Sequence, residues 1–428
     1  MLHGIIIILV FFAVIALVVV RKLPLLLALP LVGFVIPLIA GVPFLTVADE
    51  IISNGSFRYA DVLVTTIFGA ALGMVMKHCG ITQTIIRKAA ELGGDKPVAI
   101  SIALFAAVAI VFVGAGQMGT YVMMATIALP IMMTVGVPGV IAQSILALAS
   151  HVGSIWSLSN WQYFTSLLGE NVTLINCIVP VTITTVVYAA VGIAFIVIQV
   201  KKSDPALWAT AKEAKAKASM ENAPWYSLLT PLVPLALVFI FNIATIPAMI
   251  IGIVYGCLTT QASKMLGILT ESFIEGINEI RSSIILTIGI GILVSAVRYE
   301  NVANAIAPLL LKILPTSMLG YILFFSLLAP LQLYRGPMGI WGMGAGLGAL
   351  MASAGVINPV AVGMALVILD RFMAADPSLT YNIWGSDFVG CDVNDIMKKL
   401  IPYCWIVVLL SMIGAAFYFS QTPAGLFI

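Results

Sequence analysis

One stretch of this chain occurs twice. In both copies, glycine and polar residues interrupt apolar sequence. The first copy carries Gly-Gln-Met-Gly at residues 116–119, and the second carries Gly-Pro-Met-Gly at residues 336–339, an offset of 220. The offset is 221 at the end of the stretch, from Gly169 to Gly390. In secondary transporters, paired interruptions of hydrophobic segments in two halves mark the substrate site. The duplication therefore predicts two structural repeats that meet at one site.

Composition places the chain in a membrane. It has 428 residues, of which 61% are hydrophobic and 9% charged, whereas a soluble protein carries about 25% charged residues. The apolar sequence is enough for roughly ten spans of about 20 residues each. We predict an all-α membrane protein, an inverted-repeat secondary transporter with about ten transmembrane helices, two re-entrant hairpins and two broken helices, surrounded by the lipid bilayer.

Several other classes of function have no support in the sequence. There is no His-Glu-x-x-His motif, no phosphate-binding Gly-rich loop and no Cys-x-x-Cys pair, so a metalloenzyme, a nucleotide-driven pump or a zinc site is not indicated. The net charge of +2 gives no reason to expect nucleic acid as a partner. We expect a protein that is not an enzyme and has no cofactor beyond possible bound sodium ions.

The sequence pattern predicts the same order of hairpins and broken helices in the two halves of the chain. The first repeat covers residues 1–200, a cytoplasmic linker covers 201–224, and the second repeat covers 225–428. Re-entrant hairpins are predicted at about 97–135 and 317–354, and broken helices at 139–170 and 357–396, with their interruptions at 157–160 and 378–382. An interfacial segment at 262–280 is expected to be separate from a span at 283–297.

Charge placement gives the predicted orientation. Each half has five spans, an odd number, so the halves are inverted relative to each other. An outside N-terminus puts fifteen Lys and Arg residues inside and three outside, as the positive-inside rule requires. The apolar run at residues 5–20 is expected to be a retained span and not a signal peptide. We expect a multi-pass protein of the bacterial inner membrane with both termini outside.

Short motifs resemble a known family. Gly-Ala-Ala-Leu-Gly at 69–73, Ala-Ser-His-Val-Gly at 149–153 and Asp376-Pro377 are similar to segments of the gluconate permeases. That family belongs to the ion transporter superfamily of organic-anion carriers, as do the citrate transporters. The resemblance implies a homodimeric elevator transporter, in which the hairpins and broken helices form a mobile domain and the other spans a scaffold.

The broken helices supply the expected chemistry. Half-helix N-termini suit a carboxylate, and exposed carbonyl ends suit a small cation. Arg335 at the second hairpin tip could hold a carboxylate with both arms of its guanidinium, or pair with a nearby Asp and lock the hairpin. Asp370 and Arg371 are expected to form a local ion pair. The predicted substrate-binding residues are Gly116, Gln117, Ser157, Ser159, Asn160, Trp161, Arg335, Gly336, Ser378, Thr380 and Asn382.

A second set is predicted to serve the coupling cation. Its members are Thr165, Ser166, Asp376, Ser386, Asp387 and Asp392. The three aspartates are expected to cluster, and one or more would ligate sodium or carry a proton. Helix capping is the alternative for Asp392. His151 is either a proton shuttle or a hydrogen-bonded structural histidine.

These features predict a cation-coupled secondary active transporter of a small organic anion, using sodium or protons and an elevator mechanism. Aromatic residues crowd the interrupted segments, among them Trp156 and Trp384. They leave open a carrier of a neutral, zwitterionic or cationic metabolite. An inorganic-ion antiporter or channel is the third possibility.

Overall fold

The computed structural model describes residues 2–20, 22–94, 96–202 and 223–428. Within them the chain is helical, and the β pairing is confined to an isolated bridge between Ile357 and Phe427. The all-helical class predicted from composition is confirmed. Most of the predicted linker, residues 203–222, lies outside the described residues.

The helices follow one another in an order that is broadly similar in the two halves. The first half contains α1 (Leu2–Val19), α2 (Leu25–Ile39), α3 (Phe44–Thr46), η1 (Val47–Ser53), α4 (Asn54–Phe57), α5 (Ala60–His78), α6 (Ile81–Gly93), α7 (Pro97–Gly114), α8 (Met118–Thr134), α9 (Gly139–Ser154), α10 (Leu158–Leu168) and α11 (Ile178–Lys202). The second contains η3 (Trp225–Leu232), α12 (Val233–Phe241), α13 (Thr245–Leu258), η4 (Ala262–Lys264), α14 (Met265–Arg298), α15 (Glu300–Leu310), α16 (Met318–Leu328), η5 (Ala329–Arg335), α17 (Gly344–Ser353), α18 (Pro359–Asp370), η6 (Arg371–Ala375), α19 (Thr380–Val389) and α20 (Val393–Gln421).

Several helices are long and apolar enough to cross a bilayer. In the described part of the chain there are six, and a seventh if α9 and α10, which are bent by 63°, count as one span. Five further apolar helices have between 10 and 17 residues. The chain is therefore a multi-pass helical membrane protein, while the predicted count of ten spans stays a prediction.

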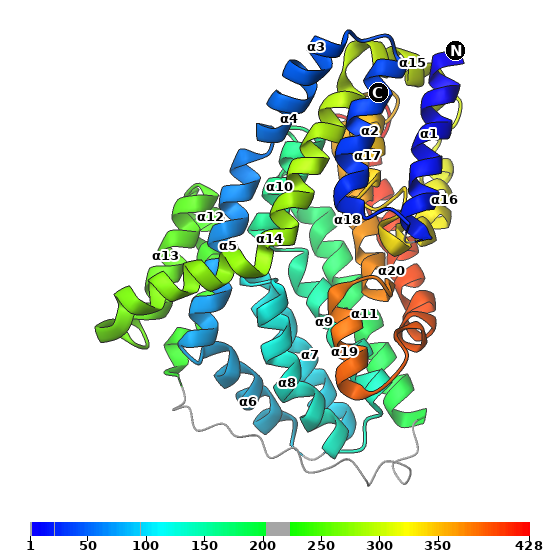
Figure 1. Cartoon of the computed structure of the whole chain (residues 1–428). Helices are drawn as coiled ribbons and strands as arrows, with labels where there is room; N and C mark the ends of the chain where they lie inside the picture. Colours follow the sequence, from blue (N-terminus) through cyan, green and yellow to red (C-terminus); the bar gives the residue numbers. More distant parts are fainter. Residues whose placement is uncertain (1, 21, 95, 203–222) are drawn as a thin grey trace.

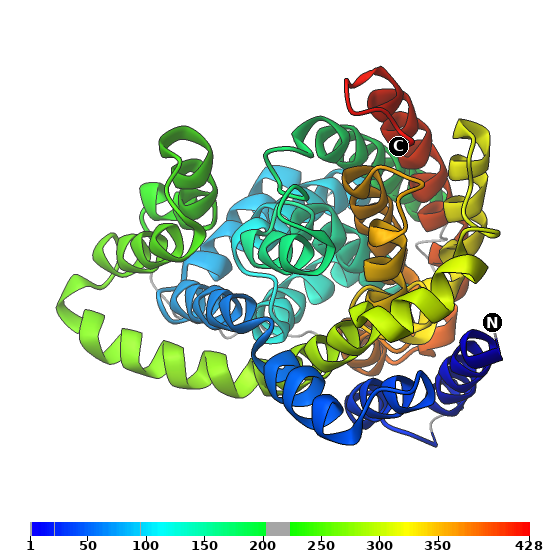
Figure 2. The same cartoon turned by 90° about the horizontal axis from the view of Figure 1, so that it is seen from above.

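The structure corrects the sequence layout in the second half. Residues 262–280 and 283–297 were expected to be separate, but α14 runs without a break from Met265 to Arg298. No proline interrupts this stretch, and its glycines alone do not stop the hydrogen-bond ladder. At 34 residues the helix is about 51 Å long, longer than the hydrocarbon core of about 30 Å. In Figure 2 it runs along one edge of the molecule.

The helices form two packed groups. In one, α14 packs against α2 and α5, and α13 packs against α5 and α12. In the other, α9 packs against α7 and α11, and α20 packs against α11, α16 and α18. Contacts of α6 with α7 and α8, of α5 with α10, and of α14 with α17 join the groups. The chain termini lie at the same end of the molecule, and α7 and α8 lie toward the other end (Figure 1).

A glycine permits the closest packing around the first hairpin. A Cβ on Gly153 in α9 would come closer than 3.0 Å to the backbone carbonyl oxygen of Ala109 in α7, a distance that real Cβ atoms essentially never show. Backbone cannot rotate away as a side chain can. We expect Gly153→Ala to lower the free energy of unfolding by about 1–3 kcal/mol.

Thermal unfolding of the purified protein measures this effect. Gly267→Ala is the matched control, because Gly267 is also helical and a Cβ there would meet nothing within 4 Å. That variant should be neutral or slightly stabilising. Equal melting temperatures for the two variants would contradict the packing of α7 on α9.

Candidate functional site

Four short segments at the ends of the hairpin legs and broken helices define the candidate site. Tip 1 comprises residues 115–119, which are the turn between α7 and α8 and the first two residues of α8, and tip 2 comprises residues 334–343 between the two legs of the second hairpin. Break 1 comprises residues 155–157 between α9 and α10, and break 2 comprises residues 376–379 between η6 and α19. These names are kept below.

Both breaks begin two residues earlier than predicted. The polar groups expected to form the interruptions, such as Ser159, Asn160 and Asn382, lie instead in the first turns of α10 and α19. Polar residues of this kind favour the start of a helix, because their side chains satisfy nearby backbone groups. The second broken helix also ends at Val389, not at residue 396, and α20 begins at Val393.

Each tip is held by a tyrosine from the broken helix of the other repeat. The Tyr381 hydroxyl in α19 donates to the carbonyl of Gly116 in tip 1 at 2.5 Å. The Tyr163 hydroxyl in α10 donates to the carbonyl of Ile340 in tip 2 at 2.6 Å. Tyr381 stacks on Tyr121 with ring centroids 4.5 Å apart, and Tyr163 stacks on Trp341 at 4.2 Å. Each half of the chain therefore contacts the hairpin tip of the other half.

The carbonyl groups at the breaks are satisfied by the chain itself. The Asn160 amide donates to the carbonyl of Ser154 at 3.1 Å, and the Trp161 indole donates to that of Ile155 at 2.7 Å. At break 2 the Asn382 amide donates to the carbonyls of Ala374 at 2.9 Å and Asp376 at 3.0 Å. The two asparagines thus play the same part in the two repeats.

This role predicts unequal costs for two matched substitutions. Asn382 is 1% exposed and makes two such bonds, whereas Asn160 is half-buried and makes one. An unsatisfied buried group costs about 1–3 kcal/mol, so Asn382→Ala should destabilise the protein more than Asn160→Ala. Denaturant unfolding of both variants measures the difference, and the reverse order would contradict the assignment.

Arg371 at the end of α18 is completely buried and fully compensated. Its guanidinium forms an ion pair with Asp370 and donates to the carbonyl of His151 at 2.7 Å and to the Ser154 hydroxyl at 2.9 Å. The predicted local ion pair is confirmed. The cation also lies at the C-terminus of α9, where a positive charge is favoured. His151 Nδ1 lies 2.9 Å from the carbonyl of Ala147, as expected for a structural histidine.

Arg335 in tip 2 is held differently. Its backbone N–H, not its guanidinium, faces the Asp376 carboxylate at 3.4 Å, and the guanidinium donates to the carbonyl of Trp341 at 3.3 Å. Among the described residues no carboxylate lies within the 4.0 Å of an ion pair with Arg335. Tyr334 and Arg335 both have positive φ angles, 56° and 54°, a conformation that costs energy and is concentrated at functional sites.

The predicted aspartate cluster does not form. Asp376 is fully buried, and its other oxygen accepts from the N–H and the hydroxyl of Ser378, both at 2.8 Å. Asp387 and Asp392 are exposed, and Asp392 caps α20 by accepting from the N–H of Asn394. These three carboxylates do not come within 4.8 Å of one another. The clustering prediction was wrong because α19 ends at Val389 and Asp392 lies at the start of the next helix, α20.

The remaining predicted residues have simpler environments. Thr165 donates to the carbonyl of Val172, Ser386 to that of Ile383, and Ser159 to that of Thr65. Ser157 and Gly336 are buried, Gln117 and Ser166 are half-buried, and Thr380 is exposed.

Two partners of tip 1 were not predicted as site residues. Gln143 in α9 accepts from the Tyr121 hydroxyl at 2.8 Å and donates to the carbonyl of Tyr381 at 3.1 Å. Glu279 in α14 accepts from the N–H of Gly119 at 2.9 Å. A glutamine in strongly apolar sequence is the signal that could have indicated Gln143, whereas Glu279 lies among other polar residues and gives no such signal.

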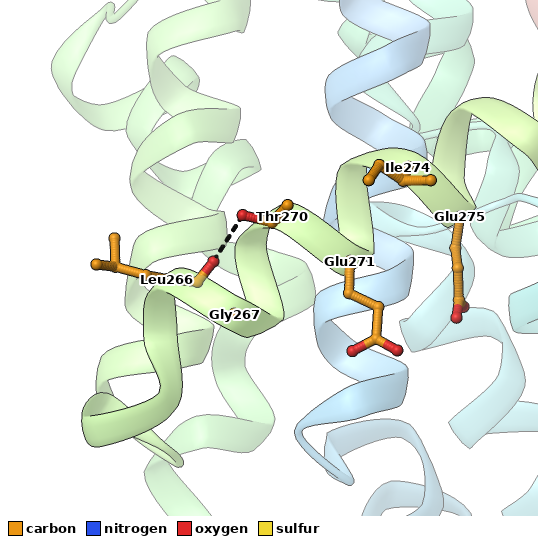
Figure 3. Close-up of a pocket in the computed structure, with 6 residues that line it drawn as sticks. All are labelled: Leu266, Gly267, Thr270, Glu271, Ile274 and Glu275. Carbon is orange, nitrogen blue, oxygen red and sulfur yellow. Dashed lines mark hydrogen bonds between the residues drawn. The ribbon is translucent and has the colours of Figure 1, made fainter.

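Little space is left beside tip 1. The hollow beside tip 1, lined by Gly114, Leu158 and Pro231 among others, has a volume of about 10 Å³, which is about the space of one water molecule. A larger hollow of about 660 Å³ lies on α14 (Figure 3) and is lined by Glu271 and Glu275 with neighbouring apolar residues. The hollow beside tip 1 is therefore too small for an organic molecule in this conformation.

The structure defines the class of fold as a polytopic helical membrane protein with paired hairpins and broken helices. Two solved transporter structures share it. One is the YdaH transporter of Alcanivorax borkumensis, with a TM-score of 0.65, 15% identity, and coverage of 89% of this chain and 90% of that one. The other is MtrF of Neisseria gonorrhoeae, described as illuminating a class of antimetabolite efflux pumps, with a TM-score of 0.64, 12% identity, and coverage of 90% and 86%. No protein-family model and no curated protein matches the chain.

Proposed function

We propose that this protein is a cation-coupled secondary active transporter of a small organic anion, driven by sodium or protons. The observation that carries this proposal is the contrast between the two buried-site arginines. Arg371 has an ion pair and two further hydrogen bonds across the repeats. Arg335 has no ion pair in the described structure and lies at a hairpin tip, where a substrate carboxylate would complete its bonding.

The proposed mechanism is an elevator motion. The hairpins and broken helices pack mainly on one another, and α2, α5, α13 and α14 pack in a separate group. In the proposed motion the first group moves against the second, and the contacts of α5 with α10 and of α14 with α17 rearrange. We also propose that the protein belongs to the ion transporter superfamily and forms a homodimer. We propose further that it lies in a bacterial inner membrane with both termini outside.

Asp376 is the residue best placed to couple a cation to the anion. It is fully buried, and as the first residue of break 2 it contacts the N–H of Arg335 in tip 2 and the N–H of Ser378 in its own segment. A buried carboxylate without its own ion pair is costly, and a bound sodium ion or a proton would relieve that cost. A cation bound to Asp376 would neutralise that carboxylate and leave the positive charge of Arg335 for the substrate carboxylate.

Uptake into proteoliposomes tests the proposal. A panel of mono-, di- and hydroxycarboxylates is offered under an inward sodium gradient, an inward proton gradient, or neither. We expect saturable uptake of at least one carboxylate that depends on one gradient and is lost in Asp376→Asn. Absence of uptake for the whole panel under every gradient would reject an organic-anion carrier.

A second candidate is a carrier of a neutral, zwitterionic or cationic metabolite. The stacked pairs Tyr121–Tyr381 and Tyr163–Trp341 at the tips favour it, because aromatic faces attract apolar and cationic groups. Export is open as well, since MtrF is described as an efflux pump. Transport current with the identified substrate alone gives the sign of the transported charge and separates these candidates.

A further inference from the structure

The N-terminus of α8 already holds a carboxylate. The N–H of Gly119, the second residue of this 17-residue helix, donates to Oε2 of Glu279 at 2.9 Å. Glu279 belongs to α14, in the other packed group of helices. A helix N-terminus carries about half a positive charge and unsatisfied N–H groups, which together favour anions.

This helix end lacks a cap of its own. Gln117, in the N-cap position, makes no side-chain capping bond. The Thr120 hydroxyl in the same first turn is fully buried and has no hydrogen-bond partner in the described part of the chain. It lies against α5, 2.7 Å from where a Cβ on Gly73 would be. The first turn of α8 therefore contains an N–H bonded to Glu279 and, beside α5, a buried hydroxyl without a partner among the described residues.

The sequence at tip 1 leaves room for that carboxylate. A Cβ on Gly119 would come closer than 3.0 Å to all three terminal atoms of Glu279. Only glycine therefore allows the carboxylate to lie flat against the backbone at this position. The approach is a feature of both partners, a glycine in the hairpin and a glutamate in α14.

Glu279 depends on this contact more than Glu275 depends on any one of its own. Glu271, Glu275 and Glu279 follow one another at four-residue spacing along α14, and Figure 3 shows the first two on the same side of the helix. Glu275 lies 3.2 Å from both Lys77 Nζ and His78 Nε2. Glu279 has no ion pair within the described residues, so the Gly119 N–H is its direct partner.

We propose that the N-terminus of α8 is a carboxylate-binding subsite, that Glu279 occupies it as a tethered stand-in, and that a carboxylate of the substrate replaces Glu279 there. The inference rests on the proposed function for the identity of the replacing anion. Replacement separates tip 1 from α14 and removes a bond between the two packed groups. Binding of substrate is thereby linked to release of the hairpin.

Hydrogen exchange with chemical rescue tests the subsite without requiring transport. The full chain is studied in nanodiscs as wild type and as Glu279→Ala, and exchange is measured for peptides covering residues 114–122. The variant should exchange about tenfold faster at tip 1, the loss expected for a bond to a charged acceptor. Acetate, which can fill the vacated space, should restore protection, whereas acetamide and chloride at equal ionic strength should not.

Two controls keep the result interpretable. Glu271→Ala removes an exposed carboxylate from the same helix and should leave exchange at tip 1 unchanged. Glu279→Gln keeps the side-chain volume, so it should exchange faster than wild type and show no response to acetate. Unaltered exchange at tip 1 in both Glu279 variants, or faster exchange that acetate does not reverse in Glu279→Ala, overturns the subsite.

A transport measurement tests the replacement step separately. For a carboxylate found by the uptake panel, Glu279→Gln should lower the KM several-fold because the competing carboxylate is gone. An unchanged or higher KM together with acetate rescue would retain the subsite but overturn replacement by substrate. Failure of the whole uptake panel would reject the proposed function and leave the exchange result standing.

Discussion

Replacing Arg335 with glutamine is expected to abolish carboxylate uptake. The guanidinium at tip 2 is half-buried, bonded to one carbonyl and without an ion pair among the described residues. Each hydrogen bond to a charged group contributes about 1.5–3 kcal/mol, so losing a two-armed contact should reduce kcat/KM by a factor of about 100 or more. Arg335→Lys should recover part of the activity, since it keeps the charge but not the planar fork.

The matched control for this prediction is Arg58→Gln. It removes the same charge from an exposed position and should leave uptake close to that of the wild type. Both variants are compared in proteoliposomes after their melting temperatures have been measured. Wild-type uptake of the carboxylate by a folded Arg335→Gln variant would contradict the assignment of Arg335 to the substrate.

Arg371→Met is expected to produce the largest loss of stability. The side chain is 0% exposed, and its ion-pair partner Asp370 is 4% exposed. Removing one member of a buried pair leaves an uncompensated charge and costs about 3–5 kcal/mol. The substitution also removes the donors that reach His151 and Ser154 at the end of α9, so the two broken helices should loosen together.

A double substitution separates the charge effect from loss of packing. Asp370→Asn combined with Arg371→Met removes both charges and should recover part of the stability lost in the single variant. Unfolding in detergent, followed by intrinsic fluorescence, provides the comparison. A single variant as stable as the wild type would show that Arg371 does not join the repeats as described.

The hairpins were the most predictable part of the fold. Pro97 stands at the start of α7, and glycines flank residue 115, so the predicted bounds of the first hairpin lie within a residue or so of the observed ones. Proline and glycine act through the local backbone, so their effect can be seen in the sequence alone. The second hairpin was less exact, because tip 2 turns at Tyr334 and Arg335 with positive φ, which no sequence rule assigns to those residue types.

The partners within the site could not be predicted in the same way. The crossed contacts of Tyr163 with Ile340 and of Tyr381 with Gly116 join residues 177 and 265 positions apart. Sequence spacing carries no information about such pairs. The predicted aspartate cluster was wrong for a local reason. The end of α19 separates Asp392 from break 2, and Asp392 starts a new helix.

The central claim is that the tips and breaks of both repeats form one substrate site. A cryo-electron microscopy structure with the transported carboxylate bound tests it most directly. We expect ligand density between tip 1 and tip 2, with a carboxylate on the Arg335 guanidinium and the tips farther apart than in the present structure. Density in the hollow on α14 beside Glu271 and Glu275, with the tips unchanged and Arg335 uncontacted, would contradict it.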